Sequence, residues 1–317
     1  MDISRFAAIS TVGAGLLLGS RPVFAQSALP TVRMGTMQND ALGEPFYGAD
    51  AGTFQANGIN PDVTYFGSGA NIVAAALAGN LDVGIANPLS IAVAIARYIP
   101  LQALAPGNLI SKTHATQNLV VARDSLVKNP KDLAGATIGV SEIGSLNYYS
   151  ILSWLDSYGV APKSVKFAEL TFNEVGVALE RGRIQAAFLQ EPFTSRFLAA
   201  GQIRLFGSTY LAIAPELSVA IWCATKAWVK NNSDTAKKLV NGIYATAKYC
   251  NTHHAETGAT LIRVAKLDPA TFGSVKRADY ATRPDRKYLD PILQLASKYG
   301  AVQRPVSYEE FMGLNNT

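Results

Sequence analysis

The sequence predicts an α/β protein of two lobes, each a mostly parallel sheet covered by helices, with a double-stranded hinge between them. Three observations carry this prediction. Short, apolar, β-rich runs alternate with helical segments, as in consecutive βαβ units. This alternation stops near residue 120 and then begins again. Extended segments near residues 120 and 220 would carry the chain from one half to the other and back.

The first lobe begins with the elements between residues 31 and 96. Its helices are followed by glycines that can adopt the left-handed conformation that closes a helix, and Gly58 and Gly79 occupy such positions. The predicted strands are Thr31–Met37, Pro61–Phe66 and Leu81–Ala86, and the predicted helices are Phe46–Asn57, a segment from Gly67 to Gly79, and Leu89–Ala96.

The second lobe repeats this order after the extended segment Leu119–Arg123. We assign residues 26–120 to the first part of lobe 1, 121–219 to lobe 2, and 220–317 to the return to lobe 1 with C-terminal helices. The predicted strands are Thr137–Val140, Val165–Leu170 and Ile184–Leu189; the predicted helices are Ser145–Tyr158 and Phe172–Arg181 and, after the extended run Leu217–Thr225, Ser233–Thr252, Ala255–Ala265 and Arg286–Tyr299.

Composition and charge exclude several classes of protein. The chain has 317 residues, of which 49% are hydrophobic and 16% charged, so it can bury a sizeable core and does not resemble a disordered chain. There are 28 Lys and Arg against 23 Asp and Glu, a formal charge of +5, and the basic residues are scattered. We therefore expect no nucleic-acid partner and no polybasic membrane patch.

The first 25 residues have the features of a secretory signal peptide. Arg5 supplies a positive charge, Phe6–Gly19 is apolar, and Val23-Phe24-Ala25 offers small residues at the −3 and −1 positions of a cleavage site. The apolar stretch is shorter than the ~20 residues that span a bilayer. We therefore expect cleavage near Ala25 and a periplasmic mature protein.

Signals for catalysis are poor. The sequence has no G-x-S-x-G elbow, no Walker loop, and no G-x-G-x-x-G after a strand. His253 and His254 are adjacent and would point to different sides of a helix, and His114 lies in a polar stretch. Cys223 in a strand and Cys250 late in a helix favour two buried thiols. We expect no catalytic residues, no metal site and no cofactor.

Polar or glycine-rich residues follow several predicted strands, where open α/β sheets place their ligand crevice. Ser68 and Ser145 each begin a helix whose first N–H groups lack an intrahelical partner and favour an oxyanion. Ordinary helix capping would also explain either serine, but one polar set in each lobe favours a shared site. The candidate ligand-binding residues are Gln38, Asn39, Ser68, Gly69, Ala70 and Asn87 in lobe 1, and Gly144, Ser145, Leu146, Asn147 and Glu191 in lobe 2.

A series of short motifs occurs in a fixed order along the chain: Gly43–Ala49, Gly52–Ile59, Gly67–Ala70, Ala76–Gly84, Asp132–Val140, Gly182–Ala187 and Glu191–Phe193. Their order and spacing resemble those of the periplasmic solute-binding proteins of the sulfonate/nitrate/taurine group, which also includes binders of pyrimidine precursors. The resemblance covers nearly the whole mature chain. Tyr98 departs from it where the group has a small residue, and Glu191 stands where Asp is common.

The resemblance implies a type II periplasmic-binding-protein fold and a role as the solute-binding component of an ABC-type importer. Such proteins close two lobes on a small molecule and deliver it to a membrane permease driven by a cytoplasmic ATPase. We expect a monomer that captures an organosulfonate, a taurine-like molecule, or a related anion or zwitterion. Three alternatives stay open: a binder of a pyrimidine-like or aromatic heterocycle, delivery to a sensor, and a pyrimidine-synthase-like enzyme.

The predicted site contains no Lys or Arg, although the group commonly binds anions. Its one acid is Glu191, and a buried carboxylate is costly unless it meets a cation or a hydrogen-bond donor. We therefore expect a ligand with an amine or ring N–H, and an oxyanion at its other end; nitrate has no donor and fits poorly. The aromatic side chains nearest in sequence could wall a ring, although we expect at least two of them to pack in the core; they are Phe46, Tyr47, Tyr148 and Phe193.

Overall fold

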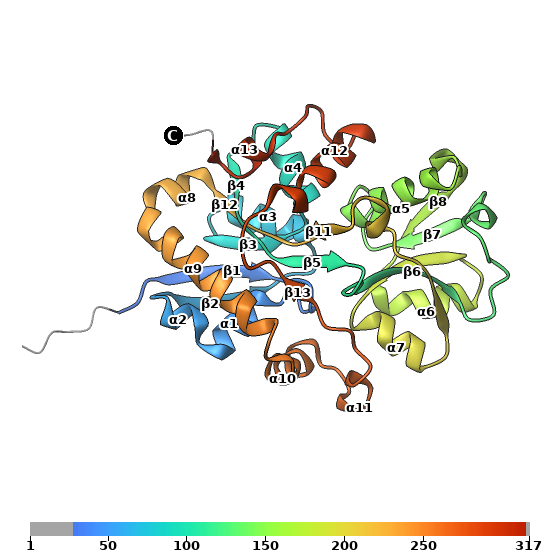
Figure 1. Cartoon of the computed structure of the whole chain (residues 1–317), viewed down its shortest axis with the longest axis horizontal. Coiled ribbons are helices and arrows are strands. Elements are labelled where there is room, and N and C mark those ends of the chain that lie inside the picture. The colour runs from blue at the N-terminus through green and yellow to red at the C-terminus, as the bar shows by residue number, and fades with distance from the viewer. Residues whose placement is uncertain (1–27, 315–317) are drawn as a thin grey trace, which may run out of the picture.

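The computed structural model describes residues 28–314 and consists of two α/β lobes that lie side by side (Figure 1). The predicted signal peptide lies outside the described residues. Each lobe contains a five-stranded sheet, and a small three-stranded sheet lies between the lobes. Four of the five strands in each large sheet run in the same direction, which confirms the predicted mostly parallel sheets.

The sheet of lobe 1 has the order β2-β1-β3-β12-β4, with β12 antiparallel to both its neighbours. Its strands are β1 (Thr31–Thr36), β2 (Asn60–Tyr65), β3 (Val83–Ala86), β4 (Leu101–Pro106) and β12 (Ile221–Thr225). The accompanying helices are α1 (Glu44–Ala51), α2 (Thr53–Ala56), α3 (Gly69–Leu77), α4 (Pro88–Ala96), α8 (Lys226–Asn231), α9 (Ser233–Cys250), α10 (His254–Ala265), α11 (Pro269–Phe272), α12 (Asp290–Lys298) and α13 (Tyr308–Phe311).

Strand β12 shows why this sheet is apolar on both faces. Ile221 and Cys223 pack into the cluster formed with α4, whereas Trp222 and Ala224 pack into the cluster formed with α2 and α9. Successive side chains of a strand point to opposite faces, so a strand covered by helices on both sides is apolar at every position. Cys223 and Cys250 are both free and buried, as predicted.

One predicted helix is interrupted. The segment Phe46–Asn57 forms two helices, α1 and α2, because Gly52 between them adopts φ 71°, a left-handed conformation that ends the first helix. The second helix stops, as predicted, just before Gly58, which has φ 79°.

Lobe 2 has the sheet order β10-β6-β9-β7-β8, with β6 antiparallel to both its neighbours. Helix α5 covers one face of this sheet, and α6 with α7 covers the other. The strands are β6 (Gln117–Ala122), β7 (Thr137–Val140), β8 (Lys166–Glu169), β9 (Ala186–Gln190) and β10 (Ile203–Gly207), and the helices are α5 (Leu146–Ser157), α6 (Val175–Glu180) and α7 (Phe193–Ala199).

Two antiparallel strands carry the chain between the lobes, so the predicted double-stranded hinge is present. Strand β5 (Asn108–Ser111) leaves lobe 1 and pairs with β11 (Glu216–Ser218), which returns; β13 (Asp279–Tyr280) pairs with the other side of β5. The outward crossing precedes the predicted segment Leu119–Arg123, because most of that segment forms β6 inside the lobe 2 sheet. At Gly107, just before β5, a Cβ would lie 2.7 Å from Glu44 Oε2 and 3.2 Å from the Ala220 carbonyl oxygen, so any larger residue would require the buried Glu44 side chain to move.

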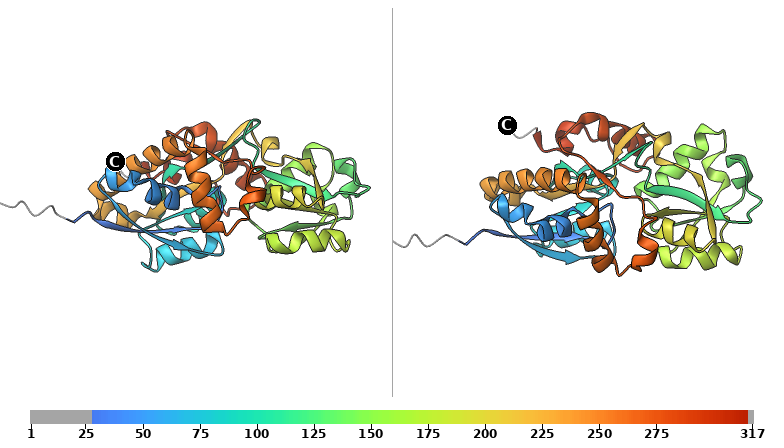
Figure 2. Two further views of the ribbon diagram at one scale, coloured as in Figure 1. Left: turned by 90° about the horizontal axis from the view of Figure 1, so that it is seen from below. Right: turned by 60° about the horizontal axis from the view of Figure 1, so that its bottom comes forward.

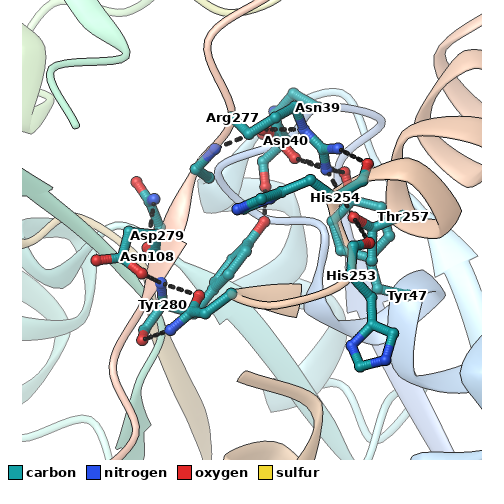
Figure 3. Close-up of polar contacts among 12 residues, drawn as sticks. Asn39, Asp40, Tyr47, Asn108, His253, His254, Thr257, Arg277, Asp279 and Tyr280 are labelled. Atoms are coloured by element: carbon teal, nitrogen blue, oxygen red, sulfur yellow. Dashed lines mark hydrogen bonds and ion pairs between the residues drawn. The ribbon is translucent and has the colours of Figure 1, made fainter. Parts of the chain in front are cut away.

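A buried ion pair anchors the C-terminal part of the chain to lobe 1 (Figure 3). The carboxylate of Asp40, in the turn after β1, accepts hydrogen bonds from Arg277 Nε (3.0 Å) and Nη2 (2.9 Å), and from the Ala278 N–H (2.7 Å). The Tyr47 hydroxyl also donates to this carboxylate, and the Tyr280 hydroxyl donates to the Asp40 carbonyl oxygen. These contacts compensate the burial of Asp40, whose side chain is 1% exposed.

Replacing Asp40 by Asn should destabilise the fold, because it leaves the Arg277 guanidinium enclosed without its carboxylate. The expected loss is ~3–5 kcal/mol in the free energy of unfolding, as for other broken buried pairs. Denaturant unfolding at pH 7 measures it. Asp234→Asn is the matched control, because Asp234 is 90% exposed in its pair with Lys237 and should leave the midpoint unchanged. Equal midpoints for the two variants would contradict the anchoring role.

Candidate ligand-binding site

A cavity of about 240 Å³ lies between the lobes. Its walls come from the segments that follow β1, β2 and β3 in lobe 1 and β7, β8 and β9 in lobe 2, so it lies at the carboxyl ends of parallel strands from both sheets. Typical small-molecule sites measure ~300–1,000 Å³, so this cavity suits a small solute.

The structure brings together five of the predicted site residues around this cavity. Ser68, Gly69 and Asn87 line it from lobe 1, and Ser145 and Asn147 line it from lobe 2. Each lobe therefore contributes polar groups, although the two sets are far apart in the sequence.

Three predicted residues in this region do not line the cavity because their neighbours face it instead. Ala70 follows Gly69 in the first turn of α3, and Gly144 precedes Ser145 with φ 84°. Leu146, the first residue of α5, is fully buried in the apolar cluster of lobe 2.

Gln38 and Asn39 also turn away from the cavity. The Gln38 amide donates to the Val264 carbonyl oxygen (2.8 Å) and faces a separate cavity. Asn39 Oδ1 accepts the Leu42 N–H (3.0 Å) within its own turn. Both amides therefore stabilise the loop after β1. Leu42, in the same loop, does line the cavity.

Glu191 lies outside the cavity lining as well. It directly follows Gln190, the last residue of β9, and Gln190 is the one that faces the cavity. Neighbouring residues of an extended chain point to opposite sides, which separates the two. The Glu191 carboxylate is buried and accepts hydrogen bonds from the Ser195 N–H (3.1 Å) and hydroxyl (3.0 Å).

The two predicted serines act as helix caps at the cavity. Ser68 Oγ accepts the Asn71 N–H (3.2 Å) at the start of α3, and Ser145 Oγ accepts the Tyr148 N–H (3.5 Å) at the start of α5. Each hydroxyl thus satisfies the third N–H group of its helix. The first N–H groups, such as that of Gly69, have no acceptor within the helix and are not capped by the serine. Two helix N-termini from different lobes thus border one small cavity.

Residues that the sequence interpretation did not include complete the lining. Gln117 of β6 and Gln190 of β9 lie opposite each other in the sheet register, and Tyr210 donates its hydroxyl hydrogen to Asn147 Oδ1. The strand-end rule that selected Ser68 also applies to Gln190, which ends its strand. It does not select Gln117, which begins β6 and reaches the same edge of the sheet because β6 is antiparallel to β9. Other lining residues missed in this way are Ser141, Glu142, Thr171 and Phe172. The aromatic residues at the cavity are Phe172 and Tyr210, and none of the four aromatic residues considered from the sequence lines it.

Glu142 gives the cavity its charge. Within the described chain, it is the one formally charged residue in the lining, and its carboxylate has no hydrogen-bond or ion-pair partner there. Burial raises the pKa of Glu142, and the neighbouring carboxylate of Glu169 raises it further. A ligand that brings a cationic nitrogen would relieve both effects.

None of the described histidine side chains lines this cavity. Among residues 28–314, no group of three or more His, Cys, Asp or Glu side chains is arranged to hold a metal ion. His253 stacks on Tyr249 at 4.0 Å between ring centroids, and His114 Nδ1 lies 3.9 Å from Asp279 Oδ2 in the hinge region.

Within residues 28–314, no helix is long and apolar enough to cross a bilayer.

Two α/β lobes with paired hinge strands and a polar cavity between their strand ends define the two-lobed fold of the periplasmic binding proteins. The chain belongs to the NMT1-like family, whose sequence model matches residues 25–265. It is 27% identical over 189 residues to the taurine-binding periplasmic protein of Escherichia coli K12, an alignment that covers 60% of this chain and 57% of that protein.

Solved structures support the same fold. The periplasmic aliphatic sulphonate-binding protein of Escherichia coli superimposes with a TM-score of 0.74 at 16% identity, over 90% of this chain and 96% of that one. A desulfurization enzyme superimposes with a TM-score of 0.66 at 15% identity, over 90% of this chain and 98% of the enzyme. At these identities the likeness concerns the fold alone, and the fold accommodates both binding proteins and an enzyme.

Replacing Gly69 by Pro should weaken the binding of a small sulfonate by about 10- to 150-fold, because it removes one N–H donor to an anion, worth ~1.5–3 kcal/mol. Gly69 is the first residue of α3, where proline is compatible with a helix, and Ser68 before it is already extended (φ −152°, ψ 158°). Isothermal calorimetry gives the affinity, and thermal unfolding should show an intact fold.

The control for this substitution is Gly69→Ala, which keeps the N–H. An added Cβ would lie 3.5 Å from Ala86 Cβ, an ordinary contact, so this variant should bind nearly as the wild type does. If Gly69→Pro also binds normally, the backbone of α3 does not hold the ligand.

Proposed function

We propose that this protein is the extracytoplasmic solute-binding component of an ABC-type importer, and that it captures a small organosulfonate or taurine-like zwitterion between its lobes. The observation that carries the proposal is the cavity bordered by the N-termini of α3 and α5, one from each lobe. Helix N-termini stabilise an oxyanion without a formal cation. A ligand held from both sides stabilises the closed arrangement of the lobes.

The charge of the cavity supports a zwitterion. The lining contains Glu142 and no Lys or Arg among the described residues. An oxyanion at the helix N-termini and an ammonium at Glu142 would satisfy both ends of an aminosulfonate. The relative named for taurine binding agrees with this chemistry. Nitrate, which has no donor group, would leave the carboxylate of Glu142 unpaired.

A binding role also agrees with the kinds of side chain at the site. The cavity lining within the described residues includes no His and no Cys, the groups on which a pyrimidine-synthase-like enzyme depends. The proposal further places the mature protein in the periplasm, after cleavage near Ala25, as a monomer that delivers its solute to a membrane permease with a cytoplasmic ATPase.

A thermal-shift screen of sulfonates, aminosulfonates, nitrate and pyrimidines tests this function. A ligand at a hundred times its Kd stabilises the folded protein by about 2.7 kcal/mol, which such a screen detects. Mass spectrometry after prolonged incubation should recover the ligand unchanged. Stabilisation by pyrimidines alone would favour the heterocycle binder, and a converted ligand would favour an enzyme.

Replacing Glu142 by Gln should lower the affinity for taurine by about 10- to 150-fold, because it removes a charged hydrogen bond worth ~1.5–3 kcal/mol. Ethanesulfonate has the same carbon and sulfonate skeleton without the amine, so its affinity should stay the same or rise. Calorimetry on both ligands isolates the contribution of the amine. Equal losses for the two ligands would show that Glu142 supports the site and does not recognise a cation.

The same residue predicts how binding depends on pH. An ammonium favours the ionised form of Glu142, whose pKa in the free protein is raised. The affinity for taurine should therefore increase as the pH rises through the acid range in which Glu142 loses its proton. The affinity of Glu142→Gln should lack this increase.

A further inference from the structure

The segment between α10 and β13, residues 266–278, bridges the two lobes and is called the clasp here. It begins in lobe 1 and places α11 against α7 of lobe 2; in Figures 1 and 2 it passes beside that lobe before returning. Its C-terminal end is tied to lobe 1 through Arg277 and Asp40. The clasp is therefore an interlobe connection separate from the hinge strands β5 and β11.

One hydrogen bond between the clasp and lobe 2 is made by the hydroxyl group of Ser195. Ser195 Oγ, in α7, lies 2.9 Å from the carbonyl oxygen of Ser274 in the clasp and 3.0 Å from Glu191 Oε1. The side chains around this contact are buried: Ser195, its neighbour Thr194, and Glu191, which is only 3% exposed. Few water molecules can therefore take part in this contact.

Counting hydrogens shows that the contact has two forms. A serine hydroxyl has one hydrogen to donate, yet both neighbours of Ser195 Oγ are acceptors when Glu191 is ionised. The carboxylate, being charged, attracts this hydrogen more strongly than the carbonyl does. Ser195 Oγ and the Ser274 carbonyl oxygen then lie 2.9 Å apart with no hydrogen atom between them, so the two oxygen atoms repel each other. If Glu191 is protonated, its own hydrogen goes to Ser195 Oγ, and the serine donates to Ser274.

We propose that Glu191, Ser195 and Ser274 form a proton-controlled latch, in which protonation of Glu191 completes the hydrogen bond between lobe 2 and the clasp. Uptake of one proton by the carboxylate joins the lobes, and its loss to solvent releases them. This inference does not depend on the identity of the ligand, because Glu191 lies outside the lining of the cavity.

The surroundings of Glu191 place this change near neutral pH. Burial raises the pKa of Glu191 to about 7; the hydrogen bonds from Ser195 oppose the shift, Asp40 of lobe 1 adds to it, and Lys276 of the clasp opposes it. Glutamate in water has a pKa of ~4.3. Water that reaches Glu191 when the clasp moves away lowers its pKa toward that value. The latched state therefore binds the proton more tightly than the released state, so it is favoured at low pH and weakens as the pH rises through about 7.

Energy transfer between dyes on the two lobes of the ligand-free protein tests the latch. Lys237→Cys in α9 of lobe 1 and Glu180→Cys in α6 of lobe 2 provide exposed attachment sites, while both native cysteines are buried. Between pH 5 and pH 8 the wild type should shift toward a longer interlobe distance, with a change of at least about tenfold in the latched-to-released ratio, since each pKa unit of difference gives tenfold.

Variants separate the latch from other causes of pH dependence. Glu191→Gln keeps a permanent N–H donor to Ser195 and should show the short distance at every pH. Ser195→Ala removes the relay and should show the long distance at every pH. Asp124→Asn removes an exposed lobe 2 acid that lies outside the cavity lining and should keep the wild-type shift. A constant distance in the wild type, or a pH shift that persists in Glu191→Gln, would overturn the proposal.

Discussion

The buried carboxylate of Asp40 is the group on which the region between the lobes depends. It lies in the turn after β1 that also supplies Leu42 to the cavity wall, and it holds Arg277 and Ala278 of the C-terminal segment. A carboxylate removed from water needs such donors to offset the loss of hydration. One anchor therefore fixes the cavity wall, the position of β13 in the hinge sheet, and the end of the clasp.

The cavity uses groups that the fold already requires. Ser68 and Ser145 cap helices α3 and α5, so their hydroxyls serve the stability of the helices while the neighbouring N–H groups stay available at the cavity. The acids, by contrast, differ in their surroundings. Burial raises the pKa of Glu44 to about 8, although the hydrogen bond from the Trp222 indole N–H opposes this shift. Glu142 instead faces the cavity, and Glu191 faces the clasp. Burial and neighbours assign each carboxylate a different role.

The sequence alone determined the elements whose signals are local. Buried strands such as β3 and β9 were predicted because helices on both faces make every position apolar. The helix starts at Ser68 and Ser145, and the helix end at Gly58, follow from capping chemistry within a few residues. The two-lobed arrangement followed from the order of these elements, and five of the cavity residues followed from the rule that ligands lie beyond strand ends.

Tertiary structure decided what depends on distant parts of the chain. Strands β4 and β10 were missed because neither is a continuous buried run: buried and half-buried residues alternate along most of β4, and only the first residue of β10 is buried. Whether Gln190 or Glu191 faces the cavity depends on the pleat at the end of β9 and on where α7 packs, and a motif does not encode either. The clasp arises from an ion pair between residues 237 positions apart, and no local pattern marks such a contact. Local propensities fix the elements, whereas long-range packing selects which side chains meet.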